Sequence, residues 1–168
     1  VEKVEVADLS QTDAQAWCDQ NGFQLSKEED FSDSVAEGGF ISQSPQAGIQ
    51  LEKGSTVTVH YSKGKEPTME DKNALAKAES YSSMMHMSKA AIYDQLTSSY
   101  GEGFPAESAQ YAVDHLVADY KANALEKAKD YQTSMNMSRS AIYEQLTSSY
   151  GEKFTAEEAQ YAVDHLPQ

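Results

Sequence analysis

The segment 84–87 has the side chains best suited to binding a soft metal. It reads Met-Met-His-Met, and thioether and imidazole groups together suit copper(I). A related segment at 134–137 reads Ser-Met-Asn-Met, so only Met85 and Met87 have identical counterparts. Methionines kept in both segments are better explained as flexible fillers of a core than as ligands. We therefore expect no metal site, and we expect Met85 and Met87 to pack inside.

Groups that could transfer protons or attack a substrate are few. Asp114-His115 recurs as Asp164-His165, but neighbouring residues on a helix point about 100° apart, so neither pair forms a dyad. A histidine near the end of a helix instead interacts favourably with the helix dipole. Cys18, the single cysteine, follows Trp17 and is expected to be a small core residue. The sequence also lacks a glycine-rich phosphate loop and a metal-spaced Cys/His cluster. It therefore predicts a non-enzyme, with no catalytic residue and no cofactor.

A duplicated stretch dominates the second half of the chain. Residues 73–116 are repeated as residues 123–166, and about 31 of the 44 aligned positions are identical. An enzyme gathers different side chains around one cleft, whereas a duplicated unit presents the same surface twice. The duplication therefore favours binding over catalysis.

Acidic residues outnumber basic ones in both halves of the chain. The 168 residues include 27 Asp or Glu and 13 Lys or Arg, giving a net charge of −14. Such a chain repels phosphate backbones and anionic lipids, so we expect no nucleic-acid partner. A solvated acidic surface without a charged partner is one interpretation, and attraction of a basic protein is the other. For the second, the predicted binding residues are the paired acids of the repeats: Asp94, Glu102, Glu107, Glu144, Glu152 and Glu157.

Residues 1–64 have the pattern of a small α+β unit. Val4 and Val6 alternate with charged residues, as in a half-buried strand. Thr12 is placed to cap a helix that ends before Gly22, and this helix has its apolar side chains on one face. Further strands are expected from Phe23, from Phe40 and over 56–61, where β-branched residues are concentrated.

This unit resembles the PASTA domain, an extracellular module of penicillin-binding proteins and membrane Ser/Thr kinases of Gram-positive bacteria. The similarity rests on VEVADLSQTDAQAWCDQNGF, on the QSPQAG turn and on LEKGSTVTVHYSKG, although Ala7 and Ala36 replace the prolines usual in the family. The resemblance implies one helix on a small sheet. It implies either peptidoglycan binding or a role as a spacer or dimerisation element.

Beyond a linker at 65–72, apolar residues follow the 3.6-residue period of helices. In the first repeat, the expected inner faces include Leu75, Ala78 and Met85 on a first helix and residues 91–96 on a second. Ser88 is placed to cap the second helix, and Pro105 to begin a third. Thr155 and Glu158 form a capping-box pattern at the corresponding place in the second repeat. The predicted domains are 1–64, 73–118 and 119–168, the last two all-α.

The connection between the repeats has two interpretations. Residues 106–134 contain neither Gly nor Pro, so one helix could run from the first repeat into the second. The alternative is a break near residues 121–123. The sequence does not decide between them.

Both repeats contain the segments AIY-x-QLTSSYGE and AQYAVDHL. With these segments, nearly all of residues 73–166 resemble the Ltp family of host cell surface-exposed lipoproteins, and the pattern is highly specific. The resemblance implies three-helix units that contain a helix-turn-helix, displayed outside a Gram-positive membrane. It also implies a role in superinfection exclusion, in which entry of phage DNA is blocked. A DNA-reading role is not expected, because each repeat has more acids than bases.

The sequence as a whole predicts a non-catalytic binding or scaffold protein of a Gram-positive envelope. Its partner would be a protein with a basic surface, such as a phage protein, or cell-wall peptidoglycan. No apolar run reaches the roughly 20 residues of a membrane-spanning helix, so we expect an anchor outside this sequence. The alternative is a peptidoglycan-binding or spacer ectodomain of a larger membrane protein, such as a kinase or transpeptidase.

Overall fold

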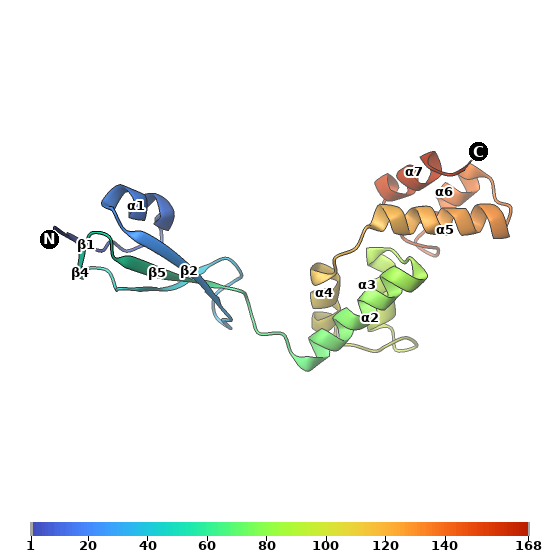
Figure 1. Cartoon of the computed structure of the whole chain (residues 1–168). Coiled ribbons are helices and arrows are strands. Elements are labelled where there is room, and N and C mark those ends of the chain that lie inside the picture. Colours follow the sequence, from blue (N-terminus) through green and yellow to red (C-terminus); the bar gives the residue numbers. More distant parts are fainter. Residues whose placement is uncertain (1, 168) are drawn as a thin grey trace. The chain divides into compact units, whose positions relative to one another are not determined.

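The computed structural model describes residues 2–167 and divides into two compact units, Val1–Glu66 and Pro67–Gln168 (Figure 1). The first unit packs one helix on small sheets, and the second is built of helices only. The predicted fold class, an α+β unit followed by all-α tandem repeats, is confirmed.

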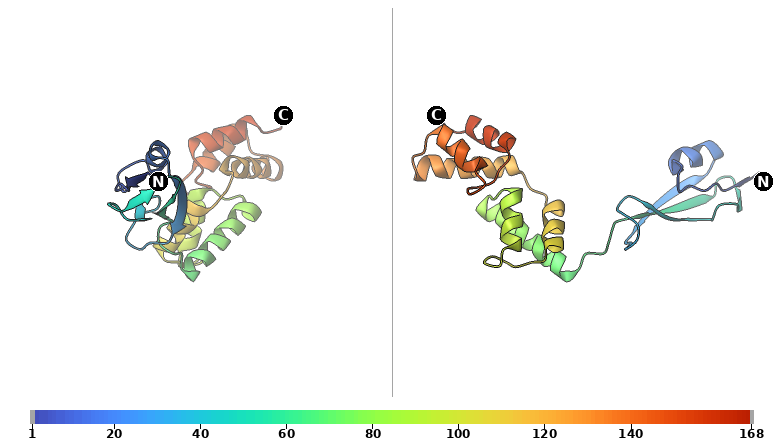
Figure 2. Two further views of the ribbon diagram at one scale, coloured as in Figure 1. Left: turned by 60° about the vertical axis from the view of Figure 1, so that its left-hand side comes forward. Right: turned by 180° about the vertical axis from the view of Figure 1, so that it is seen from behind.

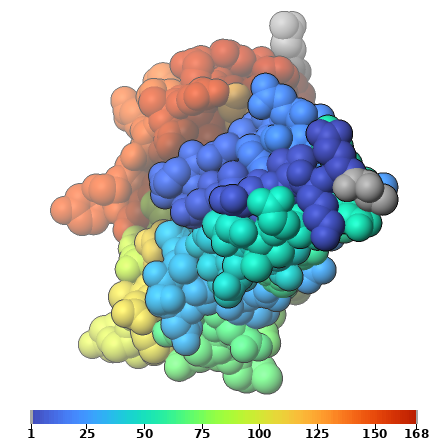
Figure 3. Space-filling model, turned by 90° about the vertical axis from the view of Figure 1, so that its left-hand side faces the viewer, coloured from blue at the N-terminus to red at the C-terminus, as the bar shows by residue number. Residues whose placement is uncertain are grey.

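The strands of the first unit form two sheets in the described residues. A two-stranded antiparallel sheet pairs β1 with β4, which lie side by side in the space-filling view (Figure 3). The three-stranded sheet has the order β2-β5-β3, with β2 parallel and β3 antiparallel to β5. Strand β4 is too short for its alternation to be recognised in the sequence. The strands are β1 (Lys3–Glu5), β2 (Gln24–Asp30), β3 (Phe40–Ser44), β4 (Gln50–Glu52) and β5 (Thr56–Ser62).

Helix α1 (Ala14–Asn21) covers the larger sheet. Its N-cap is Asp13, whose carboxylate accepts hydrogen bonds from the amides of residues 15 and 16, so the prediction that Thr12 is the cap is wrong by one residue. Gly22 ends the helix in the left-handed conformation, with φ of 76°, as predicted. Cys18 is fully buried in the core, and this burial raises the pKa of its thiol.

The second unit consists of two three-helix groups in succession (Figure 2). The first and third helices of each group pack against one another, and the second helix contacts both. The first repeat contains α2 (Met69–Met85), α3 (Lys89–Thr97) and α4 (Ala106–His115). The second repeat contains α5 (Tyr120–Ser134), α6 (Arg139–Thr147) and α7 (Ala156–Asp164).

Capping side chains fix where these helices begin. Thr68 and Asp71 form a capping box, so α2 starts at Met69, within the stretch 65–72 that we expected to be a linker. Ser88 caps α3, as predicted. Thr155 and Glu158 form the predicted capping box of α7.

The chain turns between the repeats instead of continuing as one helix. Helix α4 ends at His115 and α5 begins at Tyr120. Asp119 caps α5 by accepting a hydrogen bond from the amide of Ala122, and this supports a break without Gly or Pro. The long-helix interpretation is therefore wrong, and the break precedes the predicted residues 121–123.

Each repeat has its own small apolar core. The cores contain mainly alanines from the first and third helices around two larger residues of the second helix, Ile92 and Leu96 in one repeat and Ile142 and Leu146 in the other. Met87 packs partly against the first core. Met85, however, is 52 % exposed, so its predicted core position is wrong. The buried stripe of α2 passes through Ala78 and Ser82, and Met85 lies off it at the end of the helix.

Candidate binding surfaces of the helical repeats

In each repeat, a partly buried tyrosine on the first helix bonds to the loop that follows the second helix. The Tyr81 hydroxyl donates to Glu102 at 2.5 Å, and Tyr131 donates to Glu152 at the same distance. Lys77 lies 3.1 Å from the Glu102 carboxylate. The bond from Tyr81 and the neighbouring Lys77 lower the pKa of Glu102. Two of the six predicted binding carboxylates therefore already have partners inside their own repeat.

The tyrosine of the second repeat lies in the more protected setting. Burial and the bond to Glu152 raise the pKa of Tyr131 to about 12. Burial also raises the pKa of Tyr81, where the charge of Lys77 acts in the opposite direction. Both phenols therefore remain neutral donors at physiological pH. The Glu152 side chain is only 17 % exposed, which leaves little of it for a partner protein.

The other predicted binding residues are exposed, but their surroundings differ. Asp94 on α3 forms an ion pair with Lys153 of the second repeat, whereas Glu144, its counterpart on α6, forms none within the described residues. Glu157 pairs with Lys121 at 2.6 Å, and this contact lowers the pKa of Glu157. Glu107 lies exposed in the first turn of α4. The six acids do not converge on one point, and their role in binding stays a prediction.

The predicted end-of-helix histidines contact the preceding turn. The Nδ1 atom of His115 lies 2.8 Å from the carbonyl oxygen of Tyr111, and the two rings stack with centroids 4.0 Å apart. His165 and Tyr161 repeat the arrangement, with stacked centroids also at 4.0 Å. Each histidine therefore helps to finish its helix, and its Nδ1 atom is engaged with the backbone.

Contacts that sequence reasoning missed hold the two repeats together. The Asn123 amide donates to the Ser82 hydroxyl at 2.9 Å and to the Met87 carbonyl at 3.0 Å. The Ser88 hydroxyl donates to the backbone carbonyl of Glu152 at 2.5 Å. Tyr120 packs against the core of the first repeat, although it belongs to the first helix of the second. These contacts set the orientation of one repeat on the other.

A sequence signal for this interface existed in the positions where the two repeats differ. Tyr120 aligns with Glu70, and Lys153 aligns with Gly103. Lys153 adopts a φ of 59°, which is uncommon for a residue other than Gly, and from there reaches Asp94. Comparing the copies for changes of chemical type, rather than for identities, would have selected both residues.

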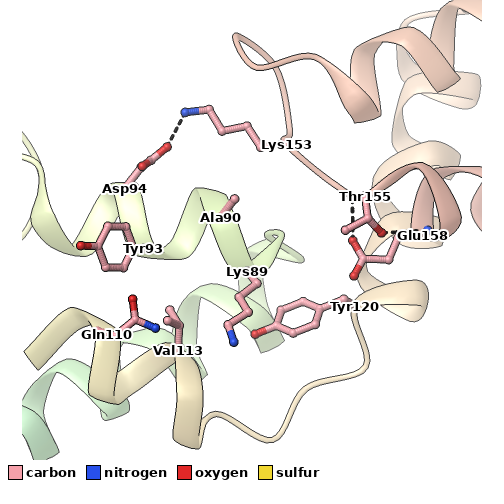
Figure 4. Close-up of a pocket in the computed structure, with 10 residues that line it drawn as sticks. All are labelled: Lys89, Ala90, Tyr93, Asp94, Gln110, Val113, Tyr120, Lys153, Thr155 and Glu158. Atoms are coloured by element: carbon pink, nitrogen blue, oxygen red, sulfur yellow. Dashed lines mark hydrogen bonds and ion pairs between the residues drawn. The ribbon is translucent and has the colours of Figure 1, made fainter. Parts of the chain in front are cut away.

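A groove of about 380 Å³ lies where the repeats meet (Figure 4). Tyr93 and Val113 of the first repeat line one wall, and Thr155 and Glu158 of the second line the other. Tyr120 projects between them. The lining combines apolar and aromatic side chains with charged and polar groups, the usual chemistry of a binding site.

Each repeat also presents one tyrosine almost completely to solvent. Tyr100 and Tyr150 are 101 % and 100 % exposed in equivalent loops. The loop is tightly packed: a Cβ atom at Gly101 would lie 2.4 Å from the Gln95 carbonyl oxygen. Two aromatic side chains are therefore displayed on structured loops.

Each of the two units matches the profile of a known protein family. The profile of the Lipoprotein_Ltp family, described as host cell surface-exposed lipoprotein, matches residues 69–116 and again 119–166. The chain belongs to this family. The PASTA domain profile matches residues 3–63, so the resemblance of the first unit is also confirmed.

Two solved structures resemble parts of the chain. One is Ltp, a superinfection exclusion protein from the Streptococcus thermophilus temperate phage TP-J34. It is 42 % identical, with a TM-score of 0.56 over 61 % of this chain and 100 % of that one. The other is the extracellular region of the Ser/Thr kinase PrkC from Staphylococcus aureus, 35 % identical over 40 % of this chain and 25 % of that one, with a TM-score of 0.36. Among curated proteins, no match was found.

Membership of the Ltp family, together with a PASTA domain, supports a location at the cell surface. Among the described residues, no helix has the length and apolar character needed to cross a membrane.

Proposed function

We propose that this chain is a non-catalytic recognition protein that takes part in superinfection exclusion by binding a basic protein of the incoming phage. The similarity to the phage TP-J34 protein, which this chain covers over its full length at 42 % identity, is the observation that carries the proposal. The net charge of −14 supports a basic partner. In this proposal an anchor outside the given sequence holds the protein at the cell surface.

Within the repeats, binding is assigned to the acids with exposed carboxylates. Asp94 and Glu144 occupy equivalent exposed positions on the second helices, and Glu107 and Glu157 on the third helices. Glu102 and Glu152 contribute indirectly in this proposal, because their carboxylates are bonded to tyrosines and hold the loops. Exposed acids attract a basic surface over a distance set by the ionic strength.

The test is a phage challenge of cells that display the full chain at their surface. Cells with the unaltered protein should admit less phage DNA than cells without it. A variant with Asp94→Asn, Glu107→Gln, Glu144→Gln and Glu157→Gln should lose most of this protection. A matched variant of the first unit, which also neutralises one Asp and three Glu, should retain it: Glu29→Gln, Asp33→Asn, Glu37→Gln and Glu52→Gln. Unchanged DNA entry with the displayed protein would contradict the proposed function.

Salt dependence provides a second measurement once a phage protein is captured. Binding through exposed charges should weaken steadily as salt approaches about 1 M, where the Debye length falls to about 3 Å. An affinity that is independent of salt would show that attraction between exposed charges does not drive binding.

A second candidate function is binding of cell-wall peptidoglycan by the first unit. The PASTA profile match over residues 3–63 favours it. In a sedimentation assay, the full chain should then pellet with purified peptidoglycan. Retention of the protein in the supernatant would leave the first unit as a spacer, including the case of an ectodomain carried by a larger kinase or transpeptidase.

A further inference from the structure

The groove between the repeats contains a carboxylate whose charge is not balanced. Lys89 pairs with Asp114 at 3.0 Å, and Lys153 pairs with Asp94, so the charge of each lysine at the groove is balanced by an acidic partner. No lysine or arginine of the described residues pairs with Glu158, whose carboxylate accepts one hydrogen bond from the Thr155 amide at 2.9 Å. The groove therefore favours a cation.

A buried hydroxyl without a partner lies in the same groove. The Tyr120 oxygen is inaccessible to solvent and has no hydrogen-bond partner within residues 2–167. Buried polar atoms without partners are rare, because each costs about 1–3 kcal/mol. Burial, followed by the negative charge of Glu158, raises the pKa of Tyr120. The hydroxyl is therefore neutral, and its oxygen can accept a hydrogen bond from a bound group that displaces the atoms now covering it.

Aromatic and aliphatic surface completes the groove. The rings of Tyr93 and Tyr120 and the side chain of Val113 face the space that Figure 4 displays. A planar guanidinium stacks on aromatic rings and is weakly hydrated, so such a groove suits arginine better than lysine.

The groove continues on the other side of Tyr120. A second depression is lined by Asp119, Lys121 and Glu157, and it shares Tyr120, Thr155 and Glu158 with the first. Lys121 there is neutralised by Glu157 at 2.6 Å. An extended peptide can therefore cross the junction of the repeats, with one side chain entering beside Tyr120.

The arrangement occurs once in the described residues, although about 31 of the 44 aligned positions of the repeats are identical. The residue that aligns with Tyr120 is Glu70, and the residue that aligns with Glu158 is the buried Ser108. The groove also needs walls from both repeats, so neither repeat contains it alone. The duplication has thus produced a surface that is absent from the single unit.

We propose that this groove receives an arginine side chain from an extended segment of the partner protein. The aliphatic part packs against Tyr93 and Val113, and the guanidinium donates to the carboxylate of Glu158. It also donates to the hydroxyl oxygen of Tyr120 once the side chains that cover this oxygen have moved aside. The inference deepens the proposed function, on which it rests, by naming the group that is recognised and the place where it binds.

The probe is a capped Gly-Arg-Gly tripeptide, added to the isotope-labelled full chain and followed by amide chemical shifts. Saturable shifts are expected at Tyr120, Thr155 and Glu158. The matched peptide carries citrulline, which has nearly the shape of arginine without its charge. It should bind at least tenfold more weakly. Equal binding of the two peptides, or shifts confined to other regions, would overturn the inference.

The variant Glu158→Gln separates charge from folding, because glutamine at this position still completes a capping box with Thr155. It should weaken binding of the arginine peptide at least tenfold. Tyr120→Phe, which keeps the ring, should weaken binding by a smaller factor. Glu126→Gln is the control: it removes a partly exposed charge that is paired with Lys129 and lines neither depression, and it should leave binding within twofold. An effect of Glu126→Gln equal to that of Glu158→Gln would mean that the peptide responds only to the overall negative charge of the protein.

The same variant distinguishes this inference from the proposed function. If Glu158→Gln abolishes binding of the peptide but leaves phage exclusion intact, the groove binds arginine but is not the contact used in exclusion, and the inference fails while the function stands. If the peptide binds as expected but the displayed protein never affects phage entry, the proposed function fails.

Discussion

The two helical repeats share most of their residues, yet equivalent side chains have different surroundings. Ser88 is 1 % exposed, whereas Ser138 is exposed at the same place in the second repeat. Asn123 is buried against the first repeat, whereas Asn73 is exposed. The difference arises because one face of the first repeat is covered by the opposite face of the second. Identical residues therefore form a core-like contact in one copy and a free surface in the other.

The largest expected difference between the copies is seen at alkaline pH. Tyr131 titrates at about 12 in the folded chain, and an unperturbed tyrosine titrates at about 10. The proton is held more tightly in the folded state, so this contribution to stability is complete below pH 10 and is lost as the pH rises to about 12. A shift of two units corresponds to about 2.7 kcal/mol at most.

Tyr131→Phe should therefore make the decrease in the free energy of unfolding between pH 10 and 12 smaller, as measured by denaturant unfolding. Tyr81→Phe is the matched variant in the first repeat. Tyr81→Phe should have a smaller effect on the pH dependence of stability than Tyr131→Phe, because Lys77 favours ionisation of Tyr81. Equal pH profiles for the two variants would contradict the different protection of the two tyrosines.

The next largest effect is expected at the asparagine of the repeat junction. Asn123→Ala removes both donors to Ser82 and Met87, and leaves their acceptor oxygens without these partners. It should lower the free energy of unfolding by about 1–3 kcal/mol. Asn73→Ala changes an exposed residue and should alter stability by less than about 0.5 kcal/mol. Similar losses for both variants would indicate that Asn123 acts through its helix rather than through the junction.

Much of each repeat could be predicted from the sequence, because its determinants are local. Ser88 and Thr155 are identified from cap chemistry, which depends only on neighbouring residues, as is Gly22 in the first unit. The turn between α4 and α5 was harder, because it relies on the cap by Asp119 and on the docking of Tyr120 into the first repeat. Docking depends on where distant segments lie, and residue patterns do not encode it directly.

The candidate groove was beyond sequence reasoning for the same reason. The sequence identifies Glu158 only as part of a capping box, and it places Tyr120 only within the stretch 106–134, for which a continuous helix was one of two interpretations. Both roles follow the local pattern. That the two side chains meet beside Tyr93 follows only from the packing of one repeat on the other.

The serine pair gives a smaller difference between the copies. Both serines cap a helix by accepting from a backbone amide, so each serine-to-alanine change should cost about 1 kcal/mol. Ser88 also donates to the carbonyl of Glu152, and losing this bond should add about 1 kcal/mol to the cost of Ser88→Ala. Thermal unfolding of Ser88→Ala and Ser138→Ala measures the difference. A larger loss for Ser138→Ala would show that the junction does not depend on this bond.

The smallest net effect is expected for Lys153→Gly, which gives the second repeat the residue found in the first. Gly103 has a φ of 68° and Lys153 one of 59°, so both residues lie in the left-handed region. Glycine relieves a strain of about 1 kcal/mol in this region. The exposed ion pair with Asp94 that is lost contributes about 0.2–1 kcal/mol. These contributions oppose one another, so stability at low salt should change by less than about 1 kcal/mol.

The salt dependence of Lys153→Gly separates the two contributions. Screening weakens the ion pair in the unaltered chain but leaves backbone strain unchanged. The variant should therefore become more stable relative to the unaltered chain as salt rises. Denaturant unfolding of both proteins at low salt and at about 1 M salt measures this change. A difference independent of salt would mean that Lys153 contributes through packing at the groove and that Asp94 is not its energetic partner.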